Sequence, residues 1–117
     1  MARLTKEFGK HYIVEFIDCN PERIKFVDDV KDAFLSAAQK SEAGMLENAF
    51  HQFQPYGVSG MIFIEESHFS IHTWPEDRYV AFDVLTCGKM YPERAIDELE
   101  KYFEAQKVET KIIPRGF

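Results

Sequence analysis

The stretch that decides the fold runs from Val58 to Thr86 and reads VSGMIFIEESHFSIHTWPEDRYVAFDVLT. β-Branched and aromatic residues dominate three segments of it, so we expect strands over 58–66, 68–74 and 79–86. Pro75 to Arg78 carry a turn signal between the last two strands. Strands that follow one another through such short connections favour antiparallel pairing.

The sequence before this stretch predicts a strand, a helix and another strand. The first strand covers 11–17 and the second covers 45–53. Between them we expect a helix over 21–40, because Asn20 is a good N-cap and Pro21 suits the first helical position. The apolar stripe of this helix repeats every three or four residues and comprises Ile24, Val27, Val30, Phe34 and Ala38.

The sequence after this stretch predicts a second helix, opened by Pro92, and a last strand over 108–113 at the edge of the sheet. The element order is then β-α-β-β-β-β-α-β. We therefore expect a single domain over 1–117 with an α+β fold, a two-layer sandwich whose antiparallel sheet carries two helices on one face. The apolar stripe of the second helix comprises Ala95 or Ile96, Leu99, and Tyr102 or Phe103.

Composition and charge exclude several classes of protein. The 117 residues are 45% hydrophobic and 29% charged, which is typical of a soluble globular chain. A formal net charge of −6 argues against general nucleic-acid binding. No apolar run is long enough for a membrane span, and residues 1–7 lack the apolar core of a signal peptide. The two cysteines, Cys19 and Cys87, are too few for a secreted disulfide scaffold, so we expect a cytoplasmic protein.

Four residues with reactive side chains gather within 21 positions, namely Ser67, His68, His72 and Cys87. A metal site is one interpretation of this cluster. His68 and His72 are four residues apart, but on a strand this spacing separates them by about 13 Å, which is too far to share one ion. A zinc site would therefore also need Cys87, His51 or His11.

A hydrolase and a purely structural role are the other interpretations. Ser67 with His72, or Cys87 with His72, could form a nucleophile–base pair. The residues around Ser67 include no glycine for a Gly-x-Ser-x-Gly elbow, which argues against a hydrolase. In the structural interpretation the two histidines hydrogen-bond within the sheet, Cys87 is a small buried apolar group, and Phe53 belongs to the core.

Six short motifs are spread along nearly the whole chain. They are Gly9-Lys10-His11, Phe53-Gln54-Pro55-Tyr56-Gly57-Val58-Ser59-Gly60, Glu66-Ser67-His68, Ile71-His72-Thr73-Trp74-Pro75-Glu76, Asp83-Val84-Leu85-Thr86-Cys87-Gly88 and Pro114-Arg115-Gly116. Together they resemble the prokaryotic S-adenosylmethionine decarboxylases. The likeness keeps one register through the middle of the chain, and the combination of motifs is specific although no single tripeptide is.

The resemblance implies a pyruvoyl-dependent enzyme that is made as an inactive proenzyme. The chain would cut itself between Glu66 and Ser67 into a β fragment, 1–66, and an α fragment, 67–117. Ser67 would become the pyruvoyl group, which would bind the amine of a small-molecule substrate as a Schiff base. The resemblance implies neither a metal nor pyridoxal phosphate.

The same resemblance assigns roles to further residues. In that family the residues matching His72 and Ser59 assist the self-cleavage, and the residue matching Cys87 donates a proton to the decarboxylated carbon. Substrate would contact Phe53, Glu66 and Trp74.

The implied reaction is decarboxylation of S-adenosylmethionine, which yields the aminopropyl donor for spermidine. The implied assembly is a homodimer of cleaved protomers with active sites at or near the interface. Two alternatives stay open: the same pyruvoyl chemistry on arginine or ornithine, and a non-catalytic dimeric α+β domain that never cleaves. Two positions depart from the family pattern: Glu65 replaces a small or neutral residue before Glu-Ser-His, and Arg78 replaces a glycine.

Strand geometry sets one condition on this scheme. Ser67 and His72 have opposite parity, so a regular strand points their side chains to opposite faces of the sheet. We therefore expect either a β-bulge between them or a strand that starts only after Ser67.

Overall fold

The computed structural model describes residues 4–117. Over these residues the chain forms one six-stranded sheet and two α-helices, with 3-10 turns at Pro21–Arg23 and Pro75–Asp77. Residues 1–3, part of the segment considered for a signal peptide, lie outside this range. The strands are β1 (Glu7–Ile17), β2 (Met45–Gln52), β3 (Val58–Ile64), β4 (Ser67–Trp74), β5 (Tyr79–Thr86) and β6 (Lys107–Gly116), and the helices are α1 (Val27–Lys40) and α2 (Pro92–Phe103).

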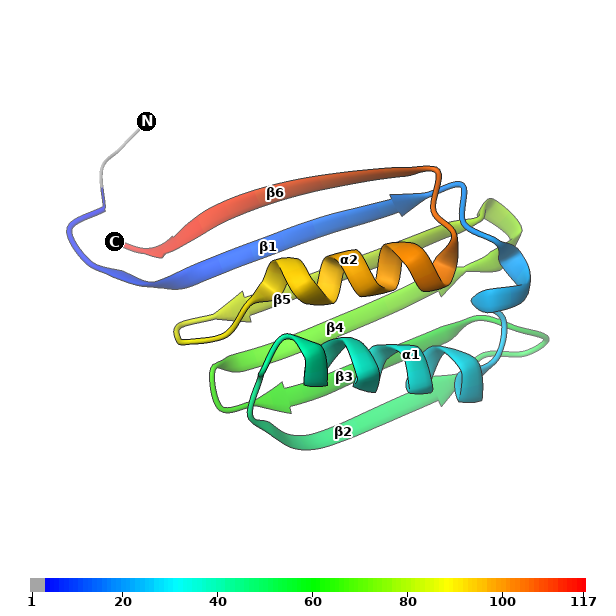
Figure 1. Ribbon diagram of the computed structural model, residues 1–117, viewed down its shortest axis with the longest axis horizontal. Helices are drawn as coiled ribbons and strands as arrows, with labels where there is room; N and C mark the ends of the chain where they lie inside the picture. The colour runs from blue at the N-terminus through cyan, green and yellow to red at the C-terminus, as the bar shows by residue number, and fades with distance from the viewer. Residues whose placement is uncertain (1–3) are drawn as a thin grey trace.

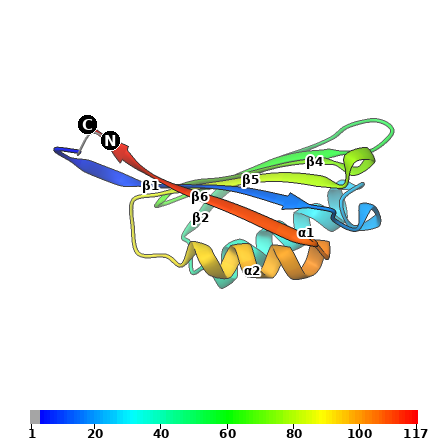
Figure 2. The same ribbon diagram turned by 90° about the horizontal axis from the view of Figure 1, so that it is seen from above.

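The sheet has the order β2-β3-β4-β5-β1-β6, and every neighbouring pair is antiparallel (Figure 1). Both helices lie against one face of this sheet, as the view in Figure 2 shows. Within residues 4–117 neither helix is long and apolar enough to cross a membrane. The predicted two-layer α+β sandwich, its element order and the edge position of the last strand are confirmed.

Side chains that alternate along the strands form the core beneath the helices. On β4, Phe69, Ile71 and Thr73 point to the helices and are buried. The ring of Phe34 from α1 packs against that of Phe69 with 6.0 Å between the ring centroids, and Leu99 of α2 is fully buried. Burying each such large apolar side chain stabilises the fold by about 1.5–3 kcal/mol, so the core holds both helices to this face.

The first α-helix starts six residues later than predicted. Asn20 does cap a helical turn, but that turn is a separate 3-10 segment. Ile24 then packs fully buried into the core, and its carbonyl accepts a hydrogen bond from the hydroxyl of Thr73 instead of from a following helical N–H. Phe26 is extended (φ −119°, ψ 146°), so α1 begins only after it. Tertiary packing of Ile24 thus overrides the local capping signal.

The turn between β3 and β4 comes earlier in the chain than predicted and contains two residues instead of one. β3 ends at Ile64 instead of Glu66, and β4 begins at Ser67 instead of His68. Only Glu65 and Glu66 remain as turn residues, which makes this a two-residue hairpin loop. The peptide bond that the family resemblance marks for cleavage therefore lies at the junction of a tight turn and a strand.

Arg78 occupies a left-handed backbone conformation (φ 53°, ψ 39°) in the turn between β4 and β5. This conformation suits glycine and costs other residues about 1–2 kcal/mol. Its N–H donates to the carbonyl of Pro75, and its carbonyl accepts from the N–H of Cys19, so neighbouring segments hold it. The backbone geometry therefore favours glycine at this position, where the resemblance led us to expect one.

We expect Thr73→Val to lower the free energy of unfolding by about 1–3 kcal/mol. The buried Thr73 hydroxyl donates to the carbonyl of Ile24 at 2.7 Å and accepts from the N–H of Val58 at 2.9 Å, and valine leaves both groups unpaired. Urea denaturation in a Ser67→Ala background, where the chain stays whole, measures the change. The exposed Thr110→Val on β6 is the matched control, and equal losses in the two variants would contradict the assignment.

Candidate active site

Three of the polar residues that the sequence singled out lie on the open face of the sheet, opposite the face that α1 and α2 cover, namely Ser59, His68 and His72. On β4 the side chains of His68, Ser70 and His72 alternate with the buried residues of the same strand. Ser59 of β3 and Asp83 of β5 join them, because the register pairs Ser59 with His72 and Ser70 with Asp83. The candidate site therefore extends over three adjacent strands.

The backbone is strained at Ser67, the first residue of β4, where φ is 149°. This angle lies outside the regions that residues with a side chain normally adopt, and such outliers cost about 1–3 kcal/mol. The strain falls on the residue that follows the peptide bond expected to break. Strained backbone of this kind is concentrated at functional sites in proteins.

Three hydrogen bonds hold the turn that precedes Ser67. The carbonyl of Glu66 accepts from the backbone N–H of Cys87 at 3.0 Å, and the Glu66 side chain accepts from the N–H of Gly44 at 3.1 Å. The N–H of Glu65 donates to the carbonyl of Gly44 at 2.8 Å. The loops around Gly44 and Cys87 therefore both hold the turn directly before Ser67.

Ser59 and His72 lie together, whereas Ser67 lies apart from both. The Oγ of Ser59 is 2.7 Å from Nδ1 of the exposed His72. Ser67 pairs with Thr86, five residues along β4 from His72, which corresponds to about 16 Å. A single chain therefore does not bring Ser67 and His72 within reach of each other.

Neither of the two arrangements expected to bring the side chains of Ser67 and His72 to one face of the sheet is present. The pairing of β4 with β3 and β5 is regular from Ser67 to Trp74, so these residues contain no β-bulge. The strand also does not start after Ser67, which is paired with Ile64 and Thr86. The strained φ of Ser67 is the irregularity found at this position instead.

The aromatic residues expected to contact substrate lie at the same end of the open face as His72. Phe53 is 47% exposed and packs edge-on against His51, with 4.6 Å between the ring centroids. Trp74 is 42% exposed, stacks on Tyr79 at 5.3 Å and lies 6.3 Å from the ring of His72. The core position considered for Phe53 is wrong, and substrate contact by these rings stays a prediction.

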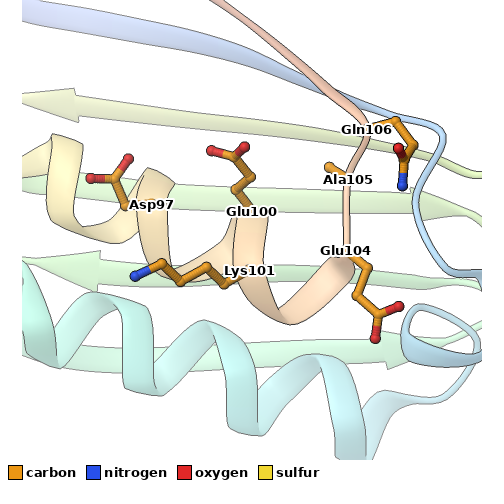
Figure 3. Close-up of a pocket in the computed structure, with 6 residues that line it drawn as sticks. All are labelled: Asp97, Glu100, Lys101, Glu104, Ala105 and Gln106. Carbon is orange, nitrogen blue, oxygen red and sulfur yellow. The ribbon is translucent and has the colours of Figure 1, made fainter.

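Two hollows on this face share His72 in their walls. The first includes His51 and Ser59, and the second includes Tyr79 and Asp83. A further hollow, drawn in Figure 3, lies along α2 and the connection from α2 to β6. It contains none of the expected site residues, and it is lined by Asp97, Glu100, Lys101, Glu104, Ala105 and Gln106.

The two cysteines have opposite environments, and both thiols are free. Cys87 is exposed beside the Glu66 turn, so the interpretation of it as a small buried apolar group is wrong. Cys19 is buried, and burial, helped by the charge of Asp18, raises the pKa of its thiol to about 12. Only Cys87 is thus placed to exchange a proton with a bound molecule.

A cluster around Asp83 was not recognised from the sequence as a unit. The Asp83 carboxylate lies 2.5 Å from Nε2 of His11 and 3.3 Å from Nε2 of His68, and it accepts a hydrogen bond from the hydroxyl of Ser70. Arg115 of β6 donates to Nδ1 of His11 at 3.0 Å. His11 and Arg115 belong to opposite ends of the chain, so only the strand register could have brought them together.

The geometry of this cluster fits hydrogen bonds better than ligation of one metal ion. The ligand atoms of His11, His68 and Asp83 do lie within 4.8 Å of one another. However, two atoms bound to one ion at about 2.1 Å each are separated by about 3 Å or more. The 2.5 Å between Nε2 of His11 and the Asp83 carboxylate is shorter than that. In addition, Nδ1 of His11 accepts a hydrogen bond from Arg115, so the ring proton of a neutral His11 is on Nε2 and this nitrogen has no lone pair for a metal ion.

Comparison with known proteins identifies the family. The family model described as S-adenosylmethionine decarboxylase matches residues 10–116. The chain is 44% identical over 109 residues to an S-adenosylmethionine decarboxylase proenzyme of Pyrococcus abyssi, covering 92% of this chain and 78% of the relative. It is 41% identical over 112 residues to that of Acidithiobacillus ferrooxidans, covering 95% and 84%.

Solved structures give the same result. The fold matches the crystal structure of the adenosylmethionine decarboxylase from Aquifex aeolicus with a TM-score of 0.87 and 28% identity, covering 97% of this chain and 94% of that one. The chain belongs to the S-adenosylmethionine decarboxylase family. The resemblance drawn from the six sequence motifs is confirmed.

We expect Asp83→Asn to change how stability depends on pH. Burial raises the pKa of the Asp83 carboxyl, but hydrogen bonds from His11, Ser70 and His68 together outweigh burial and lower it below its ordinary value of 3.8. A lowered pKa means that the carboxylate stabilises the fold above pH 3.8, and that this contribution is lost as the pH falls through the folded-state value.

Urea denaturation between pH 7 and pH 3 tests this, with Ser67→Ala as the background for both chains. The difference in unfolding free energy between them should be largest above pH 3.8 and shrink below it. Asp32→Asn, on the exposed side of α1, controls for general loss of one negative charge. A difference that stays constant over the whole range would contradict the role of the ionised carboxylate.

Proposed function

We propose that this member of the S-adenosylmethionine decarboxylase family cuts itself between Glu66 and Ser67 and then decarboxylates S-adenosylmethionine. The fragments would be 1–66 and 67–117, and the product would serve as the aminopropyl donor for spermidine. The observation that carries the proposal is the strained backbone of Ser67, directly after the Glu66 carbonyl, which accepts a hydrogen bond from the N–H of Cys87. Family membership supplies the reaction class.

The turn supports the first step of self-cleavage. The Ser67 hydroxyl would attack the Glu66 carbonyl carbon, and the peptide nitrogen would leave as the amine of Ser67, so that an ester replaces the amide. The N–H of Cys87 already donates to the Glu66 carbonyl oxygen at 3.0 Å, which stabilises the negative charge that develops there. Breaking the bond also releases the backbone strain at Ser67.

The second step needs a base. Removal of the Ser67 Cα proton expels the Glu66 carboxylate from Cβ and leaves dehydroalanine, whose imine form takes up water, loses ammonia and yields a keto group. His72 is suited to this proton transfer, because histidine exchanges protons near neutral pH and its Nδ1 is oriented by Ser59 at 2.7 Å. About 16 Å of strand separates His72 from Ser67 in one chain, so we infer that a second copy supplies it.

The open face supports such a homodimer. It exposes a set of large apolar side chains that a partner sheet could bury. A two-fold axis through this face would exchange positions between copies, so that the His72 end of one chain covers the Ser67 end of the other. Each site would then be completed by the partner. The exposed apolar residues are Met61, Phe63, Trp74 and Ile113.

The keto group at position 67 would supply an electron sink for loss of carbon dioxide from the bound amino acid. Cys87 then donates a proton to the decarboxylated carbon, a role that suits an exposed thiol beside the Glu66 turn. The exposed rings of Phe53 and Trp74 flank the region around His72 and offer faces for the adenine and the sulfonium of the substrate. Glu66, as a new C-terminus, would add negative charge near the cationic substrate.

We expect Ser67→Ala to stay whole at about 13.7 kDa and to be inactive, because the attacking hydroxyl is missing. Cys87→Ala should still yield two fragments and a ketone, yet lose most of its turnover, because its backbone N–H is kept and its thiol is lost. Intact-mass spectrometry, a hydrazine probe for the ketone and carbon dioxide release measure the three properties.

The wild-type chain is the control for this pair of variants. If it remains a single polypeptide without a ketone after prolonged incubation, self-cleavage is excluded. If it cleaves but releases carbon dioxide faster from arginine or ornithine than from S-adenosylmethionine, the substrate assignment is wrong while the pyruvoyl chemistry stands.

A complementation experiment tests the contribution of the partner. We expect His72→Ala to remain mostly whole alone, but to cleave when co-expressed with Ser67→Ala, whose His72 would serve the partner's Ser67. Two affinity tags isolate the heterodimer, and intact mass shows which chain is cut. Co-expression with the double variant Ser67→Ala/His72→Ala is the matched control and should give no cleavage. Heterodimers in which the His72→Ala chain stays whole would show that His72 acts within its own chain or not at all.

A further inference from the structure

We propose that Asp83 is a positioning residue that holds the new end of the α fragment through His68. The inference rests on the proposed function, because it concerns the chain end that cleavage between Glu66 and Ser67 would create. His68 would then be the second residue of the α fragment, directly after the reactive group. Its Nε2 lies 3.3 Å from Oδ2 of Asp83 on the neighbouring strand.

Cleavage would remove the covalent restraint on residue 67. In the uncut chain the Glu66 turn anchors this residue, but afterwards it is the free end of β4 and depends on pairing with Thr86 of β5. Strand ends fray unless side chains tie them down. The contact between the His68 and Asp83 side chains joins these same two strands, one residue from the new end of β4.

Strand register makes Asp83 suitable for this role. His68 is paired with Leu85, and Asp83 lies two residues further along β5 on the same face, which is the diagonal position that a long side chain can reach. Cys87 lies four residues beyond Asp83, directly after the end of the same strand. Holding His68 on Asp83 therefore keeps residue 67 beside the segment that carries the thiol.

Asp83 is itself fixed by two other partners. The hydroxyl of Ser70 donates to Oδ1, and His11 binds Oδ2 at 2.5 Å. Arg115 offers only donors, so its hydrogen bond to Nδ1 of His11 requires that this nitrogen accept and that Nε2 carry the proton. His11 must then donate to Asp83. The carboxylate is one-fifth exposed, and these donors fix its direction toward His68.

Asp83→Asn tests this role, because the amide removes the negative charge that attracts the two histidines and keeps only one acceptor oxygen, so its nitrogen must face either the histidines or the Ser70 hydroxyl. Turnover is expressed per mole of ketone, so that incomplete cleavage does not enter the result. We expect kcat per ketone to fall about tenfold to a hundredfold, as small misplacements of reacting groups do, with KM changed less than about twofold. Glu109→Gln, which removes an exposed carboxylate of β6 on the same face but outside the hollows around His72, is the control and should keep the wild-type kcat.

A second pair of variants keeps the test informative if Asp83→Asn does not fold. His68→Gln retains an N–H near the position of Nε2 and should recover much of the kcat, whereas His68→Phe should show the full loss. Nitrogen-15 NMR of the histidine rings adds a readout independent of activity: His11 should be the neutral tautomer protonated at Nε2, and Asp83→Asn should shift the His68 ring signals.

The outcomes separate this inference from the proposed function. If the wild-type chain forms a ketone and turns over, and Asp83→Asn or His68→Phe matches it per ketone, only the positioning role is wrong. If the wild-type chain neither cleaves nor forms a ketone, the proposed function fails and the positioning role fails with it. Equal losses in Glu109→Gln and Asp83→Asn would show a general effect of charge on this face and overturn the assignment to Asp83.

Discussion

The two-residue alternation of β4 is the constraint on which the rest of the structure depends. One set of its side chains, Phe69, Ile71 and Thr73, seals the core beneath the helices. The other set, His68, Ser70 and His72, must then point to the open face. A shift of one residue would bury the histidines and expose the aromatic core, so the hydrophobic effect that stabilises the sandwich also fixes where the reactive groups lie.

The Glu66–Ser67 turn and the Ser59–His72 pair occupy opposite ends of β4. The turn combines a strained backbone with a carbonyl already held by a hydrogen bond, and the pair offers an oriented imidazole. A sheet with both faces covered by its own helices would leave no route for the two to meet. In the proposed homodimer, a second copy would use the open face to bring the two together.

Much of the fold followed from local patterns, because apolar periodicity and turn residues report directly on strands and helices. The start of α1 did not, since burial of Ile24 and its hydrogen bond to Thr73 override the capping signal at Asn20. His72 and Cys87 were recognised from their reactive side chains, but the roles of Ser59, His72 and Cys87 came from family motifs. The Asp83 cluster depends on strand register, which brings distant segments together, and the strain at Ser67 depends on the geometry of the turn. No short segment of the sequence indicates either of them.

The contrast between the two thiols has a practical consequence for chemical labelling. Cys19 is sealed in the core with a thiol pKa of about 12, so at neutral pH it offers an alkylating reagent almost no thiolate. Cys87 is open to solvent. One equivalent of iodoacetamide or maleimide per native chain should therefore modify Cys87 alone, and the modified fraction then counts the intact Cys87 thiols in any preparation.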